Sequence, residues 1–317
     1  MTTVISVPPS LDEHTMEIVF EQLAPLPRDE KVVIDARHAR WASPYGLTAL
    51  LCVAQSRLER ADFTVPEHSD TASYWARTGF FRHAAELYEL HGHVPRHREG
   101  LESDVLLEIT PIVQSADVHG VVGRIKDKSA DILHGQLGLD MAVTGRFGMT
   151  LSEACGNIVE HAGLGGWVAV QTYAYRKRLG RRVVVIAVCD AGIGFRQSLE
   201  SSPLHRASER WDDSRALEAA VLRAVSRYRH GDEGRGQGLA QIRKFVAKWN
   251  GKLSVRSGSA RLAIIPGWDE DEPMQEALPF FPGSQMQIVI PEKVTDTATA
   301  TLANGGTATR SSKARAS

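Results

Sequence analysis

The sequence is poor in cysteine and has no long apolar run. Its 317 residues include three cysteines, Cys52, Cys155 and Cys189, which lie far apart and form no Cys-x-x-Cys pair. That count and spacing argue against a disulfide framework and against a zinc site of the usual spacing. No apolar stretch approaches the ~20 residues that span a bilayer, and the first residues, MTTVISVPPSLDE, lack the regions of a secretory signal. We therefore expect a soluble, cytoplasmic protein without a membrane partner.

The chain also lacks an excess of charge of either sign. Lys and Arg number 37, Asp and Glu number 38, and the formal net charge is −1. A protein that binds nucleic acid mainly by electrostatics carries a basic surplus, so we expect no direct nucleic-acid partner. Residues 1–91 hold 13 acidic and 8 basic side chains, which makes this stretch the acidic part of the chain.

Composition divides the chain into four stretches. We predict an α/β domain, a linker, a second α/β domain and a disordered tail, at residues 1–91, 92–103, 104–293 and 294–317. In the first domain, strand-like runs alternate with helix-like runs, at Val4–Val7, Leu11–Leu23, Lys31–Ile34 and a helix that Pro44 opens. The linker gains Gly, Pro and charge, and the tail is rich in Thr, Ala and Ser with nothing to bury.

The first motif lies on a predicted helix, Phe147–Ala162. Apolar residues at helical spacing give this helix one buried face. Glu153 and Asn157 stand four residues apart and share another face, where a carboxylate and a carboxamide can orient a water and coordinate a hard cation. Gly156 between them weakens the helix and suggests that something packs against the backbone there. A solvated helix face is the alternative at this point.

The second motif ends a predicted strand, Arg182–Asp190. The run RVVVIAVCD is almost wholly apolar, as in a strand buried in a sheet, and it stops at Asp190. Gly192 and Gly194 follow and let a ligand approach the backbone, while the carboxylate accepts a hydrogen bond. An ordinary strand-ending turn is the alternative.

The third motif is a glycine-rich loop, Gly234-Arg235-Gly236-Gln-Gly238-Leu239, that opens a helix. A helix N-terminus presents unpaired backbone N–H groups and the positive end of the helix dipole, which suits a phosphate. The loop is not a Walker A motif, and a Rossmann fingerprint is disfavoured because a helix rather than a strand precedes it. A flexible hinge is the alternative.

The order and spacing of these motifs resemble the N, G1 and G2 boxes of the Bergerat-fold ATP-binding superfamily. The resemblance covers residues 104–293 and implies an α/β sandwich with a mixed, mostly antiparallel sheet covered by helices. Ser152-Glu153-Ala154, Asn157 and His161 resemble the "SEAxxNxxxH" helix of the anti-sigma-factor serine kinases.

The resemblance implies a role for each motif. Glu153 is implied as the general base, Asn157 as the Mg²⁺ ligand and Asp190 as the partner of the adenine amino group. The nucleotide and its phosphates are implied to lie against Asn157, His161, Gly192, Gly194, Gly234, Arg235, Gly236, Gly238 and Leu239. The implied cofactors are ATP and Mg²⁺.

Residues 195–233, between the second and third motifs, are longer than the lid of the anti-sigma kinases. They include a predicted helix, Ala216–Tyr228, and six arginines, at 206, 210, 215, 223, 227 and 229. One hypothesis is that one of these arginines, or Arg235, reaches a phosphate or a partner protein. The other is that the arginines lie on a solvated face of the lid.

Residues 31–51 resemble the STAS domain, in which a strand runs into a helix through "DSSGL". Only Gly46-Leu47 and the strand–turn–helix context agree, and Tyr45 stands where the family has its phosphorylated serine. Ser43 fits a helix N-cap before Pro44 better than a phospho-acceptor. We interpret this domain as a degenerate STAS-like binding module. The nearby histidines His91, His93 and His97 have no cysteine or carboxylate in ligand register, so we do not predict a metal site there.

Two functions remain. The first is an anti-sigma-type serine/threonine protein kinase or slow ATPase that uses Mg-ATP, which the carboxylate of Glu153 favours. The second is a nucleotide-gated interaction switch without significant turnover, which the missing acceptor and the unusual lid favour. The resemblance implies a protein partner, either a STAS-type antagonist or a sigma-like regulator, and a homodimer.

Overall fold

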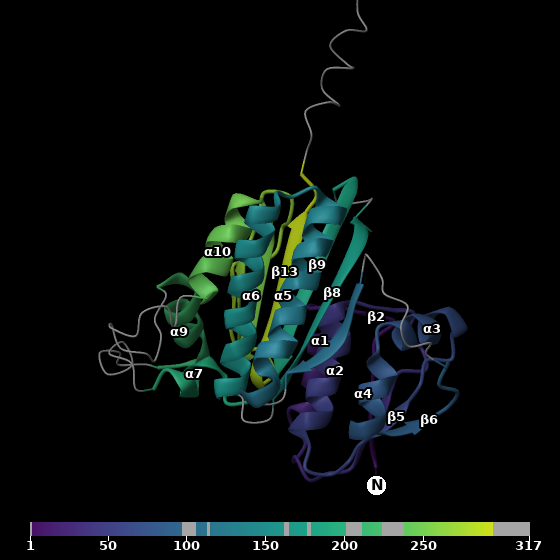
Figure 1. Ribbon diagram of the computed structural model, residues 1–317. Helices are drawn as coiled ribbons and strands as arrows, with labels where there is room; N and C mark the ends of the chain where they lie inside the picture. The colour runs from purple at the N-terminus through teal and green to yellow at the C-terminus, as the bar shows by residue number, and fades with distance from the viewer. Residues whose placement is uncertain are drawn as a thin grey trace, which may run out of the picture.

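The protein is described here by a computed structural model covering residues 2–96, 106–112, 115–161, 165–175, 179–200, 211–223 and 238–293. Two large sheets and their helices form its layers (Figure 1). No helix in these ranges is both long and apolar enough to cross a membrane. The predicted linker lies partly, and the predicted tail wholly, outside the described residues.

Residues 2–96, which we call the N-terminal unit, are built around a four-stranded parallel sheet. Its strands, in spatial order, are β1 (Thr3–Ser6), β3 (Val32–Asp35), β5 (Asp62–Thr64) and β6 (Glu89–His91). A separate parallel pair joins β2 (Ser10–Leu11) to β4 (Trp41–Ala42). The helices are α1 (Met16–Leu23), α2 (Pro44–Ser56), α3 (Ser69–Arg77) and α4 (Phe80–Leu87). The predicted alternation of strands and helices is thus present.

Helix α2 begins where the sequence predicts. The Ser43 hydroxyl accepts a hydrogen bond from the Gly46 backbone N–H at 3.1 Å, and Pro44 occupies the first helical turn. A Cβ at Gly46 would lie 2.7 Å from the carbonyl oxygen of Leu11, so this glycine lets the first turn of α2 pack on β2. The N-cap interpretation of Ser43 is therefore confirmed.

We expect Ser43→Ala to lower the free energy of unfolding by about 1 kcal/mol, because the N–H of Gly46 loses its buried acceptor. Ser43→Gly should cost only a few tenths of a kcal/mol, since glycine leaves room for water at an N-cap. Urea denaturation followed by circular dichroism measures both changes. Equal stability of wild type and the alanine variant would contradict the capping role.

The predicted helix Leu11–Leu23 begins too early. The structure places Leu11 in β2 and starts α1 at Met16. The Asp12 carboxylate accepts hydrogen bonds from the backbone N–H groups of His14 and Thr15, each at 3.0 Å. This local turn uses the amides that a longer helix would need, which delays the helix.

The second sheet has seven strands, and every neighbouring pair in it is antiparallel. In spatial order they are β12 (Met274–Gln275), β11 (Ala260–Ile264), β10 (Lys252–Gly258), β13 (Phe281–Pro291), β9 (Arg181–Asp190), β8 (Gly166–Tyr175) and β7 (Leu106–Ile112). Three long helices cover one face (Figure 1), namely α5 (Ser115–Leu137), α6 (Met141–His161) and α10 (Gly238–Lys248). The predicted α/β class, with an antiparallel sheet covered by helices, is confirmed.

Three short helices complete this half of the chain. They are α7 (Gly194–Ser198), α9 (Asp213–Leu217) and the π-helix η1 (Glu218–Leu222). The structure thus starts this helix at Asp213, three residues before the predicted Ala216, and changes it to π geometry at Glu218. The rest of the predicted helix, residues 224–228, lies outside the described ranges.

Helix α6 is longer at its start than the predicted Phe147–Ala162 and contacts α5 closely at one glycine. A Cβ at Gly148 would lie 2.6 Å from the Lys126 side chain, whereas one at Gly156 meets no described atom within 4 Å. The expectation of a close backbone contact at Gly156 is therefore wrong among the described residues. That contact lies two turns earlier.

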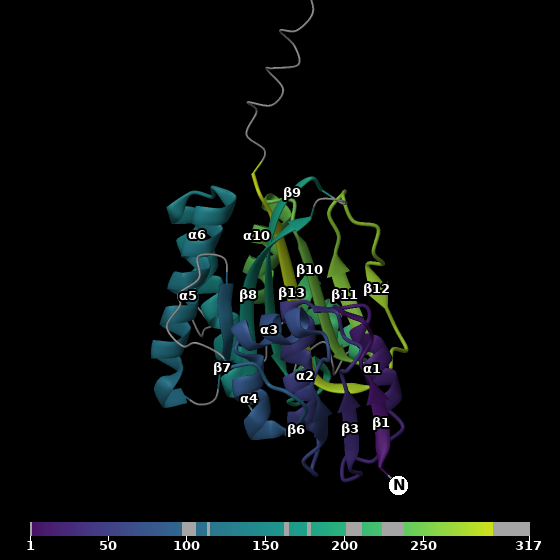
Figure 2. The same cartoon turned by 90° about the vertical axis from the view of Figure 1, so that its right-hand side faces the viewer.

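The N-terminal unit packs against one end of the other face of the seven-stranded sheet. Side chains alternate along β9, so Val188 packs under α5, α6 and α10 whereas Cys189 joins the core of the N-terminal unit. Thr48 of α2 donates a hydrogen bond to Cys189 Sγ at 3.2 Å, and the Phe20 and Phe281 rings stack 4.2 Å apart. Figure 2 shows α1 and α2 lying against one end of this sheet. At this end the sheet is thus buried on both faces.

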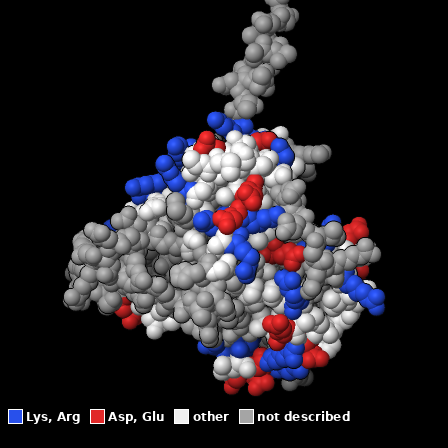
Figure 3. All heavy atoms as spheres, in the orientation of Figure 1, with Lys and Arg blue, Asp and Glu red and all other residues white. Residues whose placement is uncertain are grey.

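Buried ion pairs also join the two parts. Arg256 of β10 is 0% exposed, and Glu17 of α1 accepts from its guanidinium at 2.7 and 3.0 Å. Lys252 of β10 donates to Glu13 at 2.7 Å. Some of the acidic residues in the stretch 1–91 therefore form ion pairs with basic residues of the seven-stranded sheet. On the face that Figure 3 shows, the coloured acidic and basic side chains are largely interspersed.

Candidate functional site

The first motif lies in the second half of α6. It contains Glu153, Asn157 and His161, each four residues after the one before, and the helix ends at His161. Four-residue steps place them along one side of α6. Their side chains lie outside what the structure describes, so the roles of Glu153 as base and of Asn157 as Mg²⁺ ligand stay predictions.

Asp190 is the last residue of β9 and is 5% exposed. The alternation along the strand turns its carboxylate to the same face as Val188, which is the face that α6 covers. The Gly192 backbone N–H donates to Oδ1 at 2.8 Å, and the Ser284 hydroxyl donates to Oδ2 at 2.5 Å. Burial raises the pKa of Asp190, while these hydrogen bonds act to lower it. The carboxylate is thus held in one orientation at the end of a buried strand.

The turn after Asp190 is tightly packed. Gly194 has φ +71°, and a Cβ there would lie 2.7 Å from Ser257 Oγ. Gly283 on the neighbouring strand β13 has φ +80°, and a Cβ there would lie 2.2 Å from the carbonyl oxygen of Asp190. Ser257 ties the two together, because its hydroxyl donates to the Gly283 carbonyl at 2.8 Å and accepts from the Phe195 N–H at 3.1 Å. The glycines thus let three chain segments meet beside Asp190.

Sequence reasoning identified Asp190, Gly192 and Gly194 but missed Ser284 and Gly283. The segment PGS at residues 282–284 carries the signal, because a Pro-Gly pair followed by a hydroxyl side chain stands at the start of the last long apolar strand, β13. Only the pairing of β13 with β9 brings Ser284 to Asp190, and that pairing joins residues almost a hundred positions apart.

The third motif is described only at its end. Gly238 is the first residue of α10 and is buried, while Leu239 packs with the apolar core under the helices. Gly234, Arg235 and Gly236 lie outside the described residues. Of the six lid arginines, the structure describes Arg215, which pairs with Glu218 at 3.0 Å, and Arg223.

The cysteines and the histidines near the predicted linker lie outside the three motifs or on their buried faces. Cys155 and Cys189 are buried, and burial raises the pKa of each thiol to about 12, so both are core residues. His91 lies 3.2 Å from the Asp62 carboxylate. His97 lies outside the described ranges, and no metal-ligand group that includes His91 or His93 occurs within them.

Residues 143–293 match the family model described as histidine kinase-, DNA gyrase B- and HSP90-like ATPase. No curated protein and no solved structure matches the chain. Residues 143–293 are therefore a GHKL-type ATPase domain. The match begins inside α6, although β7 pairs with β8 in the same sheet and α5 packs on α6.

Domains of this family bind ATP, typically with Mg²⁺, and act as ATPases or kinases. Asp190 fits an adenine amino group: its carboxylate accepts hydrogen bonds from Gly192 and Ser284 and retains the capacity for a further donor. The start of α10 at Gly238 adds a helix N-terminus on the same side of the sheet.

Proposed function

We propose that the chain is an ATP-dependent serine/threonine protein kinase of the anti-sigma-factor type, or a slow ATPase, that uses Mg-ATP. The observation that carries the proposal is the buried, doubly hydrogen-bonded carboxylate of Asp190 on the side of the sheet that α6 covers. Kinase chemistry further needs a base near the γ-phosphate, and Glu153 on α6 is the candidate.

The proposed step is an in-line phosphoryl transfer. A serine or threonine hydroxyl, or water in the ATPase case, bonds to the γ-phosphorus through its oxygen while the bond to the β–γ bridging oxygen breaks. The hydroxyl proton passes to Glu153, and ADP leaves with the bridging oxygen. Asn157 would hold Mg²⁺, which neutralises phosphate charge when bound, and Asp190 would orient the adenine. Gly192, Gly194, Gly234, Arg235, Gly236, Gly238, Leu239 and His161 would line the nucleotide.

The N-terminal unit is not the phospho-acceptor in this proposal. Ser43 is 3% exposed, and its hydroxyl oxygen caps α2. Tyr45, at the position of the STAS phospho-serine, is 1% exposed. Neither hydroxyl can reach a nucleotide without opening the interface with the sheet. We therefore propose a degenerate STAS-like unit in cis and an acceptor on a separate partner, either a STAS-type antagonist or a sigma-like regulator.

One observation favours a second function, a nucleotide-gated interaction switch. The N-terminal unit contacts the strand that ends in Asp190 from its opposite face, through Thr48 and Cys189. A change at the Asp190 turn on nucleotide binding would therefore reach α2 directly. In this alternative the partner recognises the rearranged N-terminal unit, and turnover is not needed.

The experiment that separates these functions follows γ-labelled ATP with Mg²⁺ and the wild-type chain, with and without a STAS domain that retains its acceptor serine. Label on that serine identifies a kinase, and label released as phosphate identifies an ATPase. Bound ATP that keeps its label in both reactions would contradict the enzymatic proposal and support the switch.

A further inference from the structure

A cleft of about 620 Å³ lies between the N-terminal unit and the turn that follows Asp190. Arg28 and Arg57 line it from the N-terminal unit, and residues 191–194 and Arg196 line it from the ATPase domain. Neither Asp190 nor any described residue of α6 or α10 lines it, so the cleft is separate from the proposed adenine contact. A volume of this size accommodates a small ligand.

Three arginines of the cleft have no carboxylate partner. Among the described residues, no carboxylate oxygen lies within 4.0 Å of the guanidinium nitrogens of Arg28, Arg57 or Arg196. Arg28 Nε donates to the Ser56 carbonyl at 2.6 Å, and Arg57 Nη2 donates to the Glu30 carbonyl at 2.7 Å. Carbonyls carry no net charge, and a guanidinium has five N–H donors, so these arginines keep both charge and donors for a ligand.

The Arg57 side chain is also partly removed from water. Burial lowers the pKa of its guanidinium, and the charge of Arg28 adds to this effect, whereas the charges of Glu30 and Asp29 oppose it. A partly desolvated cation without an ion pair is stabilised by a bound anion. The cleft beside Arg57 has room for one.

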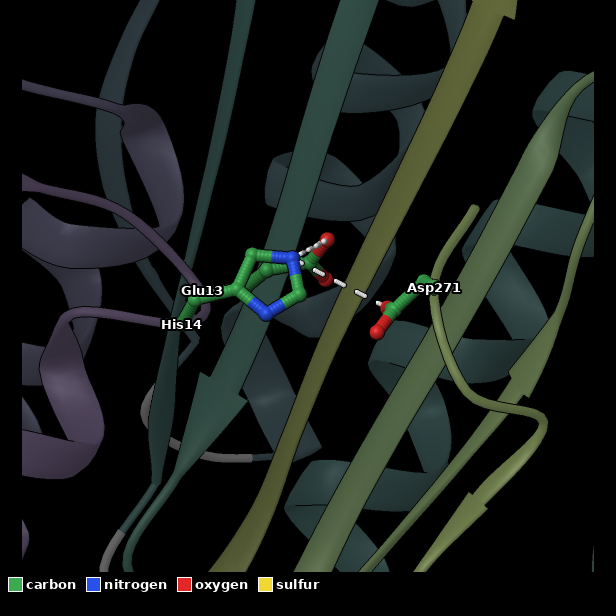
Figure 4. A group of neighbouring side chains, drawn as sticks. All are labelled: Glu13, His14 and Asp271. Carbon is green, nitrogen blue, oxygen red and sulfur yellow. Dashed lines mark ion pairs between the residues drawn. The ribbon is translucent and has the colours of Figure 1, made fainter. Parts of the chain in front are cut away.

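The charged residues at the opposite end of β10 contrast with these arginines. Glu13, His14 and Asp271 lie close together there (Figure 4), with His14 Nε2 at 3.4 Å from Glu13 and 3.8 Å from Asp271. Lys252 donates to Glu13 at 2.7 Å and lies 2.9 Å from Asp271. Those acids are already paired with basic side chains, so we assign no ligand to them.

Positive charge is in excess around the cleft, since its three arginines face two carboxylates. Asp213 is buried, and its Oδ2 accepts from the backbone N–H and the hydroxyl of Ser259, each at 2.8 Å. Glu200 is exposed, four residues after Arg196, and forms no ion pair with it. This excess favours an anion over a cation.

The cleft is apolar as well as cationic. Leu23 and Phe281, which belong to the core of the N-terminal unit and its interface with the sheet, line it from inside. Phe280 and Ile193 also line it and are 61% and 44% exposed. Large apolar side chains that stay exposed around a concave surface favour a ligand with an apolar body.

We propose that this cleft is a binding site for a small apolar carboxylate. The carboxylate accepts hydrogen bonds from the unpaired guanidinium groups, and the apolar body packs against Phe280 and Ile193. Because residues 192–194 form one wall, the ligand contacts the turn after Asp190 from the side that faces the N-terminal unit. The proposal does not depend on nucleotide binding.

Sodium octanoate is the probe, titrated into the full chain at constant ionic strength, with octylammonium chloride and sodium acetate as matched controls. Isothermal titration calorimetry and ligand-observed NMR measure binding. We expect saturable binding of octanoate and about tenfold or weaker binding of each control, because octylammonium has the opposite charge and acetate lacks the apolar body. Equal affinities for octanoate and octylammonium, or no saturable binding of octanoate, would overturn the proposal.

Arg28→Gln and Arg196→Gln should each weaken octanoate binding about tenfold, the usual contribution of a hydrogen bond to a charged group. Arg77→Gln, which changes an exposed arginine outside the cleft, should leave the affinity unchanged. Glu200→Gln should strengthen binding, because it removes a charge of the same sign as the ligand. Phe280→Ser keeps all three arginines and should weaken binding about fivefold through the lost apolar contact. Unchanged affinity in the folded Arg196→Gln and Phe280→Ser variants would overturn the proposal.

Discussion

Replacing Glu153 by alanine should lower the turnover of Mg-ATP by about 10²- to 10⁴-fold, the usual contribution of a positioned base. ATP affinity should change less than threefold, because a base that acts only on the attacking hydroxyl contributes little to ground-state binding. Single-turnover release or transfer of the γ-phosphate measures the first quantity, and a titration with a fluorescent ATP analogue measures the second.

The neighbouring Ser152→Ala is the matched control, since it lies on the same turn of α6 and has no proposed role in proton transfer. Its turnover should stay within threefold of wild type. Full activity of the Glu153→Ala variant would show that Glu153 is not the general base. A parallel loss of ATP binding would instead assign Glu153 to the nucleotide contact.

Arg256→Met should lower the free energy of unfolding by about 3–5 kcal/mol, the typical cost of removing one partner of a buried ion pair. Arg256 is wholly buried, pairs with Glu17, donates to the Gly258 carbonyl at 2.9 Å and lies 4.5 Å from the centre of the Phe20 ring. Methionine retains part of the apolar contact but leaves the Glu17 carboxylate without its cation. Urea denaturation of the full chain measures the change.

The same sheet offers a matched control in Arg182→Met. Arg182 pairs with Glu292 at 2.8 Å, but their side chains are 47% and 30% exposed, so the loss should stay below about 1 kcal/mol. Adding Glu17→Met to Arg256→Met should recover part of the lost stability, because no unpaired charge then remains. Equal effects of the two arginine replacements would contradict the shared interface between the N-terminal unit and the sheet.

The elements near the nucleotide site were predictable because their signals are local. The apolar run before Asp190 specifies a buried strand, and Ser43 with Pro44 specifies the start of α2. Helix α1 was predicted too long because the periodicity of its apolar residues continues into Leu11, while the Asp12 turn decides where the helix starts. The apolar periodicity of residues 216–228 also did not predict the π geometry that begins at Glu218.

The docking of the N-terminal unit was not predictable from such patterns. Glu13 and Lys252 are 239 positions apart, and so are Glu17 and Arg256. In β10 every residue of KLSVRSG is buried, although the charges at Lys252 and Arg256 suggest an exposed strand face. Their burial depends on carboxylates that only the folded chain brings to them. Ser284 reaches Asp190 for a similar reason, through a strand pairing that no local pattern encodes.

The most direct test of the account is equilibrium binding of ATP to wild type and Asp190→Asn. Asparagine keeps the size of the side chain and can still bond to Gly192 and Ser284, so the variant should fold, but an amide group replaces one acceptor oxygen. We predict one ATP site in the wild-type chain and at least 100-fold weaker binding in the variant. The same affinity in both proteins would show that Asp190 does not hold the nucleotide and would contradict the account.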